Sequence, residues 1–182
     1  MFKNIYVCLG ISIGVLAGLF VAVIYVLSET PAIDGIFDGT ITTIVPPMVV
    51  AWALYFAHGK GGVSFWKVGA TTTIGAIMAS VIMIIASCLF VDALGQPIWL
   101  GLGVGVLICA FIMAFEATWS PLDFVPGAFC GTATAFGIGA LYFFVDGSSV
   151  LPVVQIILAF WIGLIGAWLS DKWGNAMLKK EK

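Results

Sequence analysis

The sequence contains no arginine, and only 9% of its 182 residues are charged. A soluble domain carries about a quarter charged residues, so this composition argues against a soluble protein. Without arginine, the chain also lacks the side chain that binds phosphate and carboxylate groups in a bidentate way. The scarcity of charge therefore argues against nucleic acid as a partner.

Side chains for metal or covalent chemistry are equally scarce. The chain has one histidine and four cysteines, and no two cysteines form a CxxC pair. It has no nucleophile elbow and no glycine-rich phosphate loop followed by lysine. We therefore expect no enzymatic activity, no metal site and no cofactor. The cysteines lie inside apolar runs, where cysteine acts as a small hydrophobe: Cys8, Cys88, Cys109 and Cys130.

Apolar residues are abundant, at 62% of the chain, and the mean hydropathy is +1.18. A helix that crosses about 30 Å of hydrocarbon needs about 20 apolar residues. The first apolar run exceeds the about 7–15 residues of a signal-peptide core and lacks a cleavage site. The expected fold is all-α: a single-domain polytopic membrane protein, a bundle of six transmembrane helices with short loops. The expected spans are 5–26, 39–57, 68–91, 98–115, 125–144 and 150–169.

The lysines predict an orientation. With six spans, every lysine falls on one side of the membrane, and the opposite loops carry only acidic charges. Lysine collects on the cytoplasmic side, so both termini are expected in the cytoplasm. The lysines are Lys3, Lys60, Lys67, Lys172, Lys179, Lys180 and Lys182, and the opposite acids are Glu29, Asp34, Asp38, Asp92 and Asp146.

Small residues recur at intervals of four in two of the expected spans. On a helix, this spacing forms one continuous stripe, which lets another helix approach closely. Close packing alone is one interpretation of the stripes, and a path for a small molecule is the other. The helix-packing residues are Gly10, Gly14 and Gly18 in the first span, and Gly127, Gly131, Ala135 and Gly139 in the fifth.

Threonines inside the spans suggest where such a path could run. A hydroxyl group in hydrocarbon needs a partner, although threonine often bonds to its own helix. Pro46 and Pro47 lack the backbone N–H that would reach the carbonyls of Thr42 and Thr43. A kink stabilised by threonine is the alternative there. The path-lining hypothesis names three pairs: Thr42 and Thr43, Thr71 and Thr72, and Thr132 and Thr134.

Two ionisable residues end predicted spans on the cytoplasmic side. Glu116 follows a long apolar run, and a carboxylate within hydrocarbon is by default a functional hypothesis. At a helix end, it can also reach water. His58 ends the second span, and histidine changes charge near neutral pH. We hypothesise a gating or proton-linked role for both residues, with an interfacial position as the simpler alternative.

Two further patterns predict details of the arrangement. A shift of 58 residues places Gly69 over Gly127 within two similar helical hairpins, which suggests a parallel repeat. Residues 120–123 read as a capping box with proline at the first helical position. The second pattern would leave Pro126 as a kink inside the fifth helix.

Two segments resemble a known family. FVPGAFCGTATAF (124–136) and ALYFAHGKGG (53–62) are similar to small bacterial inner-membrane proteins of the YcdZ type, a domain-of-unknown-function family. The resemblance implies a bacterial inner membrane and a compact multi-span protein. It implies no substrate and no site residues.

The expected function is a channel or transporter for a small, neutral or weakly polar solute. The alternative is a structural or accessory subunit that docks partner helices through its glycine stripes. Polar helix faces should converge inside one bundle if the chain transports a solute, whereas a scaffold should turn its stripes outward. The expected partners are the lipid bilayer and a small neutral solute, and the sequence also allows a homo-oligomer.

Overall fold

The computed structural model describes residues 5–28, 40–138 and 151–179, and none of them forms a β-strand. The expected all-α fold is therefore confirmed. The elements in chain order are α1 (Ile5–Ser28), α2 (Thr40–His58), α3 (Gly61–Ile84) with its π-helical continuation η1 (Ile85–Ala93), α4 (Ile98–Phe115), the short 3-10 turns η2 (Glu116–Thr118) and η3 (Ser120–Leu122), α5 (Val125–Gly137) and α7 (Leu151–Lys179).

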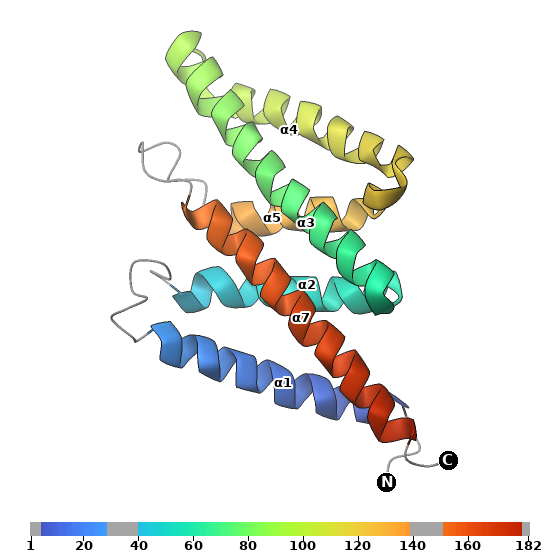
Figure 1. The fold of residues 1–182 in the computed structure, drawn as a ribbon. Coiled ribbons are helices and arrows are strands. Elements are labelled where there is room, and N and C mark those ends of the chain that lie inside the picture. Colours follow the sequence, from blue (N-terminus) through green and yellow to red (C-terminus); the bar gives the residue numbers. More distant parts are fainter. Residues whose placement is uncertain (1–4, 29–39, 139–150, 180–182) are drawn as a thin grey trace.

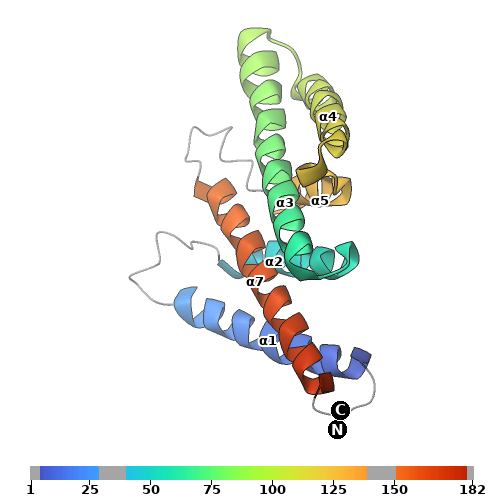
Figure 2. The same cartoon turned by 45° about the vertical axis from the view of Figure 1, so that its right-hand side comes forward.

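The helices lie in two layers (Figures 1 and 2). The long helix α7 and the long unit of α3 with η1 form one layer and contact each other. The shorter helices α4, α5, α2 and α1 lie behind them in that order. Because α1 and α2 pack on α7, and α4 and α5 pack on α3 and η1, the chain forms two three-helix groups.

The two groups have opposite orientations. The start of α1 lies against the end of α7, where the Ser12 hydroxyl donates to the Ser170 carbonyl. In the other group, Gly101 at the start of α4 lies against Ala86 in η1. The helix α3 begins at the end of the molecule where α7 finishes (Figure 1). The same three-helix arrangement therefore occurs twice, and the helices of one group run in the opposite directions to those of the other. The long helix α3 comes from the first half of the sequence but packs with α4 and α5, and α7 comes from the second half but packs with α1 and α2.

This arrangement overturns the parallel repeat predicted from the 58-residue shift. That shift pairs α2 with α4 and α3 with α5. In the structure, α5 occupies the position in its group that α2 occupies in the other, and α3 and α5 pack against each other. The repeat prediction is therefore wrong, because the helix that corresponds to α2 in the other group is α5 and not α4.

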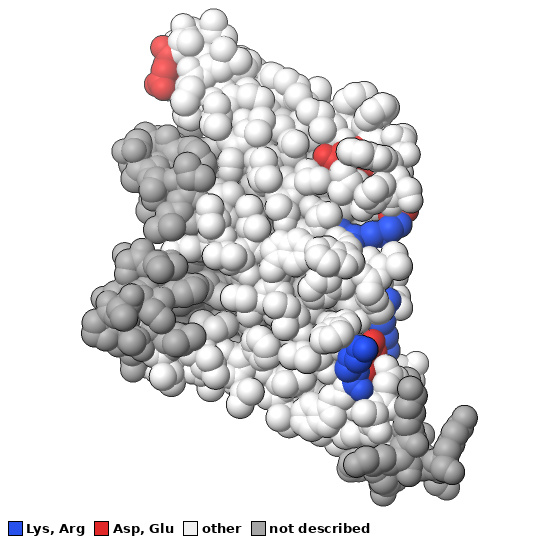
Figure 3. All heavy atoms as spheres, in the orientation of Figure 1, with Lys and Arg blue, Asp and Glu red and all other residues white. Residues whose placement is uncertain are grey.

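The described basic residues share one end of the molecule (Figure 3). Lys60 and Lys67 lie at the start of α3, and Lys172 lies near the end of α7. We call this end the lysine end. Asp92 lies in η1 at the opposite end, whereas Asp123 lies before α5 at the lysine end.

Four described segments are long and apolar enough to cross a membrane: Tyr6–Val26, Gly61–Ala93, Ile98–Thr118 and Val153–Leu178. The segment Ile44–His58 is a shorter apolar helix. The described helix α5 has 13 residues, fewer than the about 20 that a straight span needs. The four long apolar helices are compatible with a membrane. A count of six spans requires that the shorter helices α2 and α5 also cross it.

Three helix boundaries differ clearly from the expected spans. α5 ends at Gly137 rather than at residue 144. α3 begins at Gly61 rather than at residue 68, so most of the glycine-rich basic connection is helical. α7 continues to Lys179 rather than ending at residue 169. The segment after Leu169 contains no proline, and its Gly174 is buried against Leu9 of α1, so helical structure continues there.

The start of α5 also differs from the prediction. Residues Ser120–Leu122 form a 3-10 turn, and α5 begins at Val125, without a side-chain cap. Pro126 therefore lies in the first turn of α5, where the missing N–H breaks no helical hydrogen bond. The predicted interior kink at Pro126 is wrong.

Candidate functional site

The small-residue stripe of α5 lies against α3. Gly127, Gly131 and Ala135 are buried. A Cβ atom at Gly131 would collide with the backbone of Thr72, and one at Gly127 would collide with the Thr71 side chain. Gly139, the last residue of the predicted stripe, lies outside the described residues. The described stripe therefore lets two helix backbones meet closely, as small residues do between membrane helices.

The threonine hydroxyls at this interface have protein partners. The side chains of Thr71 and Thr72 are 0% exposed and donate to the carbonyls of Lys67 and Val68, at 2.8 and 2.7 Å. Thr132 donates across the interface to the Gly75 carbonyl at 2.8 Å. These three hydroxyls lie within the packed interface between α3 and α5. Each donates to a backbone carbonyl, so none needs a water molecule as its partner.

Thr134 has a different environment. Its hydroxyl donates to the Cys130 carbonyl at 2.7 Å, and its side chain is half-buried. It lines a cavity of about 390 Å³ between α2 and α5, together with Pro46, Val50, Gly137 and Ile138. The cavity lies toward the end opposite the lysines, and no described residue that lines it is charged.

The tandem prolines lie inside α2, next to this cavity. Pro46 is exposed and lines the cavity, whereas Pro47 is buried. Neither proline can donate to the carbonyl one turn earlier, so two carbonyls of α2 lose their helical partner. The side chains of Thr42 and Thr43, which the sequence places beside these carbonyls, lie outside the described ones.

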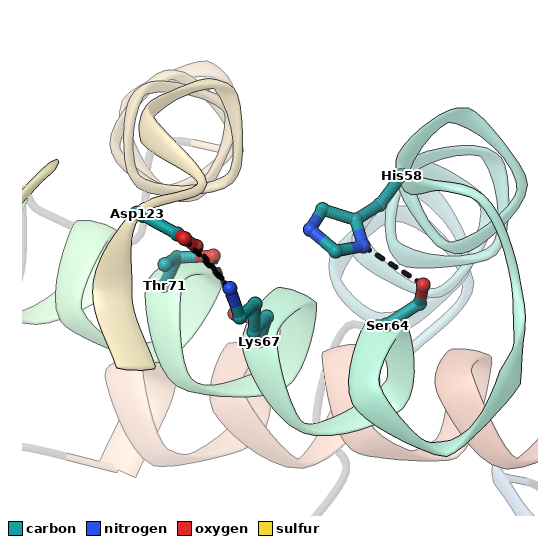
Figure 4. A network of polar contacts seen from close by, with 5 residues as sticks. All are labelled: His58, Ser64, Lys67, Thr71 and Asp123. Carbon is teal, nitrogen blue, oxygen red and sulfur yellow. Dashed lines mark hydrogen bonds and ion pairs between the residues drawn. The ribbon is translucent and has the colours of Figure 1, made fainter. Parts of the chain in front are cut away.

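At the lysine end, an aromatic contact closes α2 against α5. The ring of His58 meets the ring of Phe124 edge to face, with 4.7 Å between the ring centroids. His58 Nδ1 also lies 2.8 Å from the Ser64 hydroxyl, which donates to the Lys60 carbonyl (Figure 4). His58 is therefore held in place from α3 and packs on the residue that precedes α5.

An ion pair supports this closure. Lys67 Nζ lies 2.6 Å from a carboxylate oxygen of Asp123, directly before Phe124 (Figure 4). The pair links the first turns of α3 to the segment that enters α5. Sequence reasoning missed this pair because it assigned Asp123 to a helix cap. The opposite charges at Lys67 and Asp123 could have suggested a contact only if the parallel packing of α3 and α5 had been known.

A second polar group closes the turn between α2 and α3. The hydroxyl of Tyr55 accepts a hydrogen bond from the Gly61 backbone N–H at 2.8 Å and donates to Asp171 of α7 at 3.3 Å. This one side chain therefore connects three helices at the lysine end. Tyr55 is fully buried, and the sequence analysis did not single it out.

Glu116 lies at the lysine end, immediately after α4. Its side chain is half-buried, and its Oε2 atom is buried without a hydrogen-bond partner among the described residues. His58 and Glu116 were both predicted to end spans on the cytoplasmic side. Both lie at the lysine end, but Glu116 takes part in neither of the two contacts described there. The aromatic contact joins His58 to Phe124, and the ion pair joins Lys67 to Asp123.

The stripe of α1 differs from the prediction of helix packing. Gly10, Gly14 and Gly18 are exposed, and a Cβ atom at any of them would have open space around it. Within this chain, α1 packs on α7 with another face, which includes the buried residues Cys8 and Ser12. The spacing of the glycines correctly predicted that they share one face of α1. It did not predict which face of α1 meets α7.

The described residues offer no metal site. No three histidine, cysteine, aspartate or glutamate side chains among them could hold a metal ion together. None of the four cysteines forms a disulfide bond within the described residues, and Cys8 and Cys109 are buried. The functional candidates are therefore the cavity between α2 and α5 and the closure at the lysine end.

Comparison with known protein families gives a match over most of the chain. The family described as "Protein of unknown function (DUF1097)" matches residues 10–175. No curated protein and no solved structure matches the chain.

Proposed function

The chain belongs to the DUF1097 family of proteins of unknown function, and we propose that it conducts a small neutral solute across a membrane. In this proposal, the six helices are spans of a bacterial inner membrane, and both termini lie in the cytoplasm. The resemblance to YcdZ-type proteins supports that location and adds no substrate. The proposal includes no enzymatic step and no cofactor.

One observation carries the proposal: the two three-helix groups have inverted orientations. Inverted repeats are typical of transporters, whose substrate sites lie near the interface of the repeats. Here α2 and α5 are corresponding helices of the two groups and contact each other. A path along the contact between α2 and α5 would therefore pass between equivalent elements.

The features along this contact fit a path that is open at one end and closed at the other. The cavity beside Thr134 opens between α2 and α5 away from the lysine end. The His58–Phe124 contact closes the same two helices at the lysine end. We propose that this contact is the gate and that Glu116, half-buried at the same end, is the candidate for proton coupling.

The cavity lining favours a neutral solute over an ion. Among the described residues, the lining combines apolar surface with one hydroxyl group, from Thr134, and no charge. The freed carbonyls before Pro46 and Pro47 add acceptors, and uncharged pores select solutes through such groups. The proposed path passes Thr134, rather than the packed hydroxyls of Thr71, Thr72 and Thr132.

The exposed stripe of α1 favours a second candidate function. Gly10, Gly14 and Gly18 face away from the rest of the chain, as expected for a subunit that docks a partner helix or a second copy of itself. This role does not need the cavity between α2 and α5.

Cysteine accessibility tests the proposed path. In a protein without its four native cysteines, single cysteines at Val50 and Thr134 should react with a membrane-impermeant thiol reagent. Cysteine at Thr72, which is 0% exposed, is the matched control and should stay unreactive. If Val50 and Thr134 are as unreactive as Thr72, water does not reach the cavity, and the docking function is favoured instead.

A further inference from the structure

A groove between α3 and α7 suggests a binding site that does not depend on the proposed path. It encloses about 330 Å³ and is lined by Gly62, Phe65 and Trp66 of α3 and by Ile165 and Trp168 of α7. Trp66 is 67% exposed, so a large apolar surface lies open at this position. The groove runs between the two helices through which the three-helix groups meet.

The groove reaches the lysine end, where a cation without an ion pair among the described residues lies beside it. The ammonium group of Lys172 lies 5.0 Å from the centre of the Trp168 ring. Lys172 is exposed and forms no ion pair within the described part of the chain. The neighbouring Asp171 accepts hydrogen bonds from Tyr55 and Asn175 instead. A positive charge is thus held over the indole ring at the edge of an apolar groove.

This combination fits one kind of ligand. An acyl chain matches an apolar groove lined by aromatic rings, and tryptophan prefers the level of the lipid headgroups. A phosphate group matches an exposed lysine, and basic pockets between membrane helices bind anionic headgroups. We propose that the groove holds one anionic phospholipid, with an acyl chain between Trp66 and Trp168 and its phosphate at Lys172.

The aromatic cluster beside the groove explains why the site would be preformed. Trp161 of α7 contacts the rings of Phe65 and Trp66, at centroid distances of 5.7 and 5.6 Å. Its indole N–H donates to the Thr73 hydroxyl at 3.2 Å, and the ring packs on Gly69. These contacts fix α3 relative to α7, so the lipid would enter a groove with rigid walls.

Native mass spectrometry of the full-length protein tests the proposal. The protein is purified in detergent and mixed with equal amounts of phosphatidylglycerol and phosphatidylcholine. The expected result is one retained phosphatidylglycerol per chain, in preference to phosphatidylcholine. Lys172→Gln should reduce this retention about fivefold, the effect of one lysine on binding to an anionic surface.

Two further variants separate the site from general surface charge. Lys60→Gln is the matched control, because Lys60 also stacks on a ring, that of Phe56, but does not line the groove. It should retain the lipid. Ile165→Trp fills the groove at an exposed position and should displace the lipid while Lys172 is intact. Equal retention of both lipids, equal losses in Lys60→Gln and Lys172→Gln, or full retention in Ile165→Trp would each overturn the proposal.

Discussion

At the residue scale, the closest helix contacts place a glycine of one helix against the backbone of another. Gly75 of α3 meets the Ala128 carbonyl of α5, and Gly131 of α5 meets the Thr72 carbonyl of α3. In the other group, Gly163 of α7 meets the Met48 carbonyl of α2. The same kind of contact thus appears in both groups, because a glycine, which has no Cβ atom, lets two helix backbones approach closely.

Replacing Gly131 with leucine should destabilise the protein. The new side chain would collide with the Thr72 backbone, which cannot move away as a flexible side chain could. Overpacking of this kind costs about 1–3 kcal/mol in the free energy of unfolding. The matched control is Gly103→Leu on α4, where a new Cβ atom has open space. Thermal unfolding in detergent should separate the two variants, and equal melting temperatures would argue against a close contact of α3 and α5.

The glycine patterns also show what single residues reveal before a structure is known. Spacing by four correctly grouped Gly127 with Gly131, and Gly10 with Gly14, onto common helix faces. It could not say what lies opposite each face, because that depends on helices elsewhere in the chain. The first pair is buried against α3, and the second pair is exposed. Threonine presented the same ambiguity: Thr72 is sealed in packing, whereas Thr134 lines a cavity.

At the scale of elements, hydropathy located the helices better than it located their ends. The expected span 98–115 coincides with α4. α7 is longer than expected because its polar, proline-free last segment packs against α1 and remains helical. Serine and glycine at positions 170 and 174 fit against α1, and this contact was not visible in a hydropathy pattern.

Removing the Ser12 hydroxyl should weaken this contact. Ser12 is 0% exposed, and its hydroxyl donates to the carbonyls of Ser170, at 2.9 Å, and Leu9, at 3.0 Å. Ser12→Ala leaves the Ser170 carbonyl without this donor, so the free energy of unfolding should fall by about 0.5–1.5 kcal/mol. Ser120→Ala, at an exposed position, is the control and should unfold like the wild type. Identical stability of both variants would mean that the end of α7 does not depend on α1.

At the scale of the whole molecule, the inverted arrangement was beyond the reach of sequence reasoning. Each long helix packs with helices of the other half of the chain: α7 lies with α1 and α2, and α3 lies with α4 and α5. α3 follows α2, but α3 and its continuation η1 pack more closely with α4 and α5 than with α2. The 58-residue shift matched two glycines with different neighbours, because Gly69 lies against Trp161 of α7 and Gly127 lies against Thr71 of α3. The composition still predicted an all-helical chain with long apolar helices, because a helix satisfies every backbone hydrogen bond internally, as a segment in lipid must.

The arrangement also predicts how the proposed path could be closed. If a solute passes between α2 and α5, these helices must separate where His58 meets Phe124. Cysteines at these two positions, in a protein without native cysteines, can be joined by a cleavable thiol crosslinker. Joining them should reduce the flux of glycerol into liposomes that contain the protein to the protein-free level. Cleaving the crosslink should restore the flux, because the two helices could then separate again.

A second crosslink distinguishes the gate from general rigidity. Ser12 and Ser170 join α1 to α7 within one group, away from the contact between α2 and α5. Cysteines at these positions, joined by the same reagent, should leave the flux unchanged. Flux that persists with His58 and Phe124 joined would place the path elsewhere. Flux lost equally with either pair would show that motion within the group, and not the His58–Phe124 contact, limits passage. Only loss confined to the His58–Phe124 pair supports a gate between the two inverted groups.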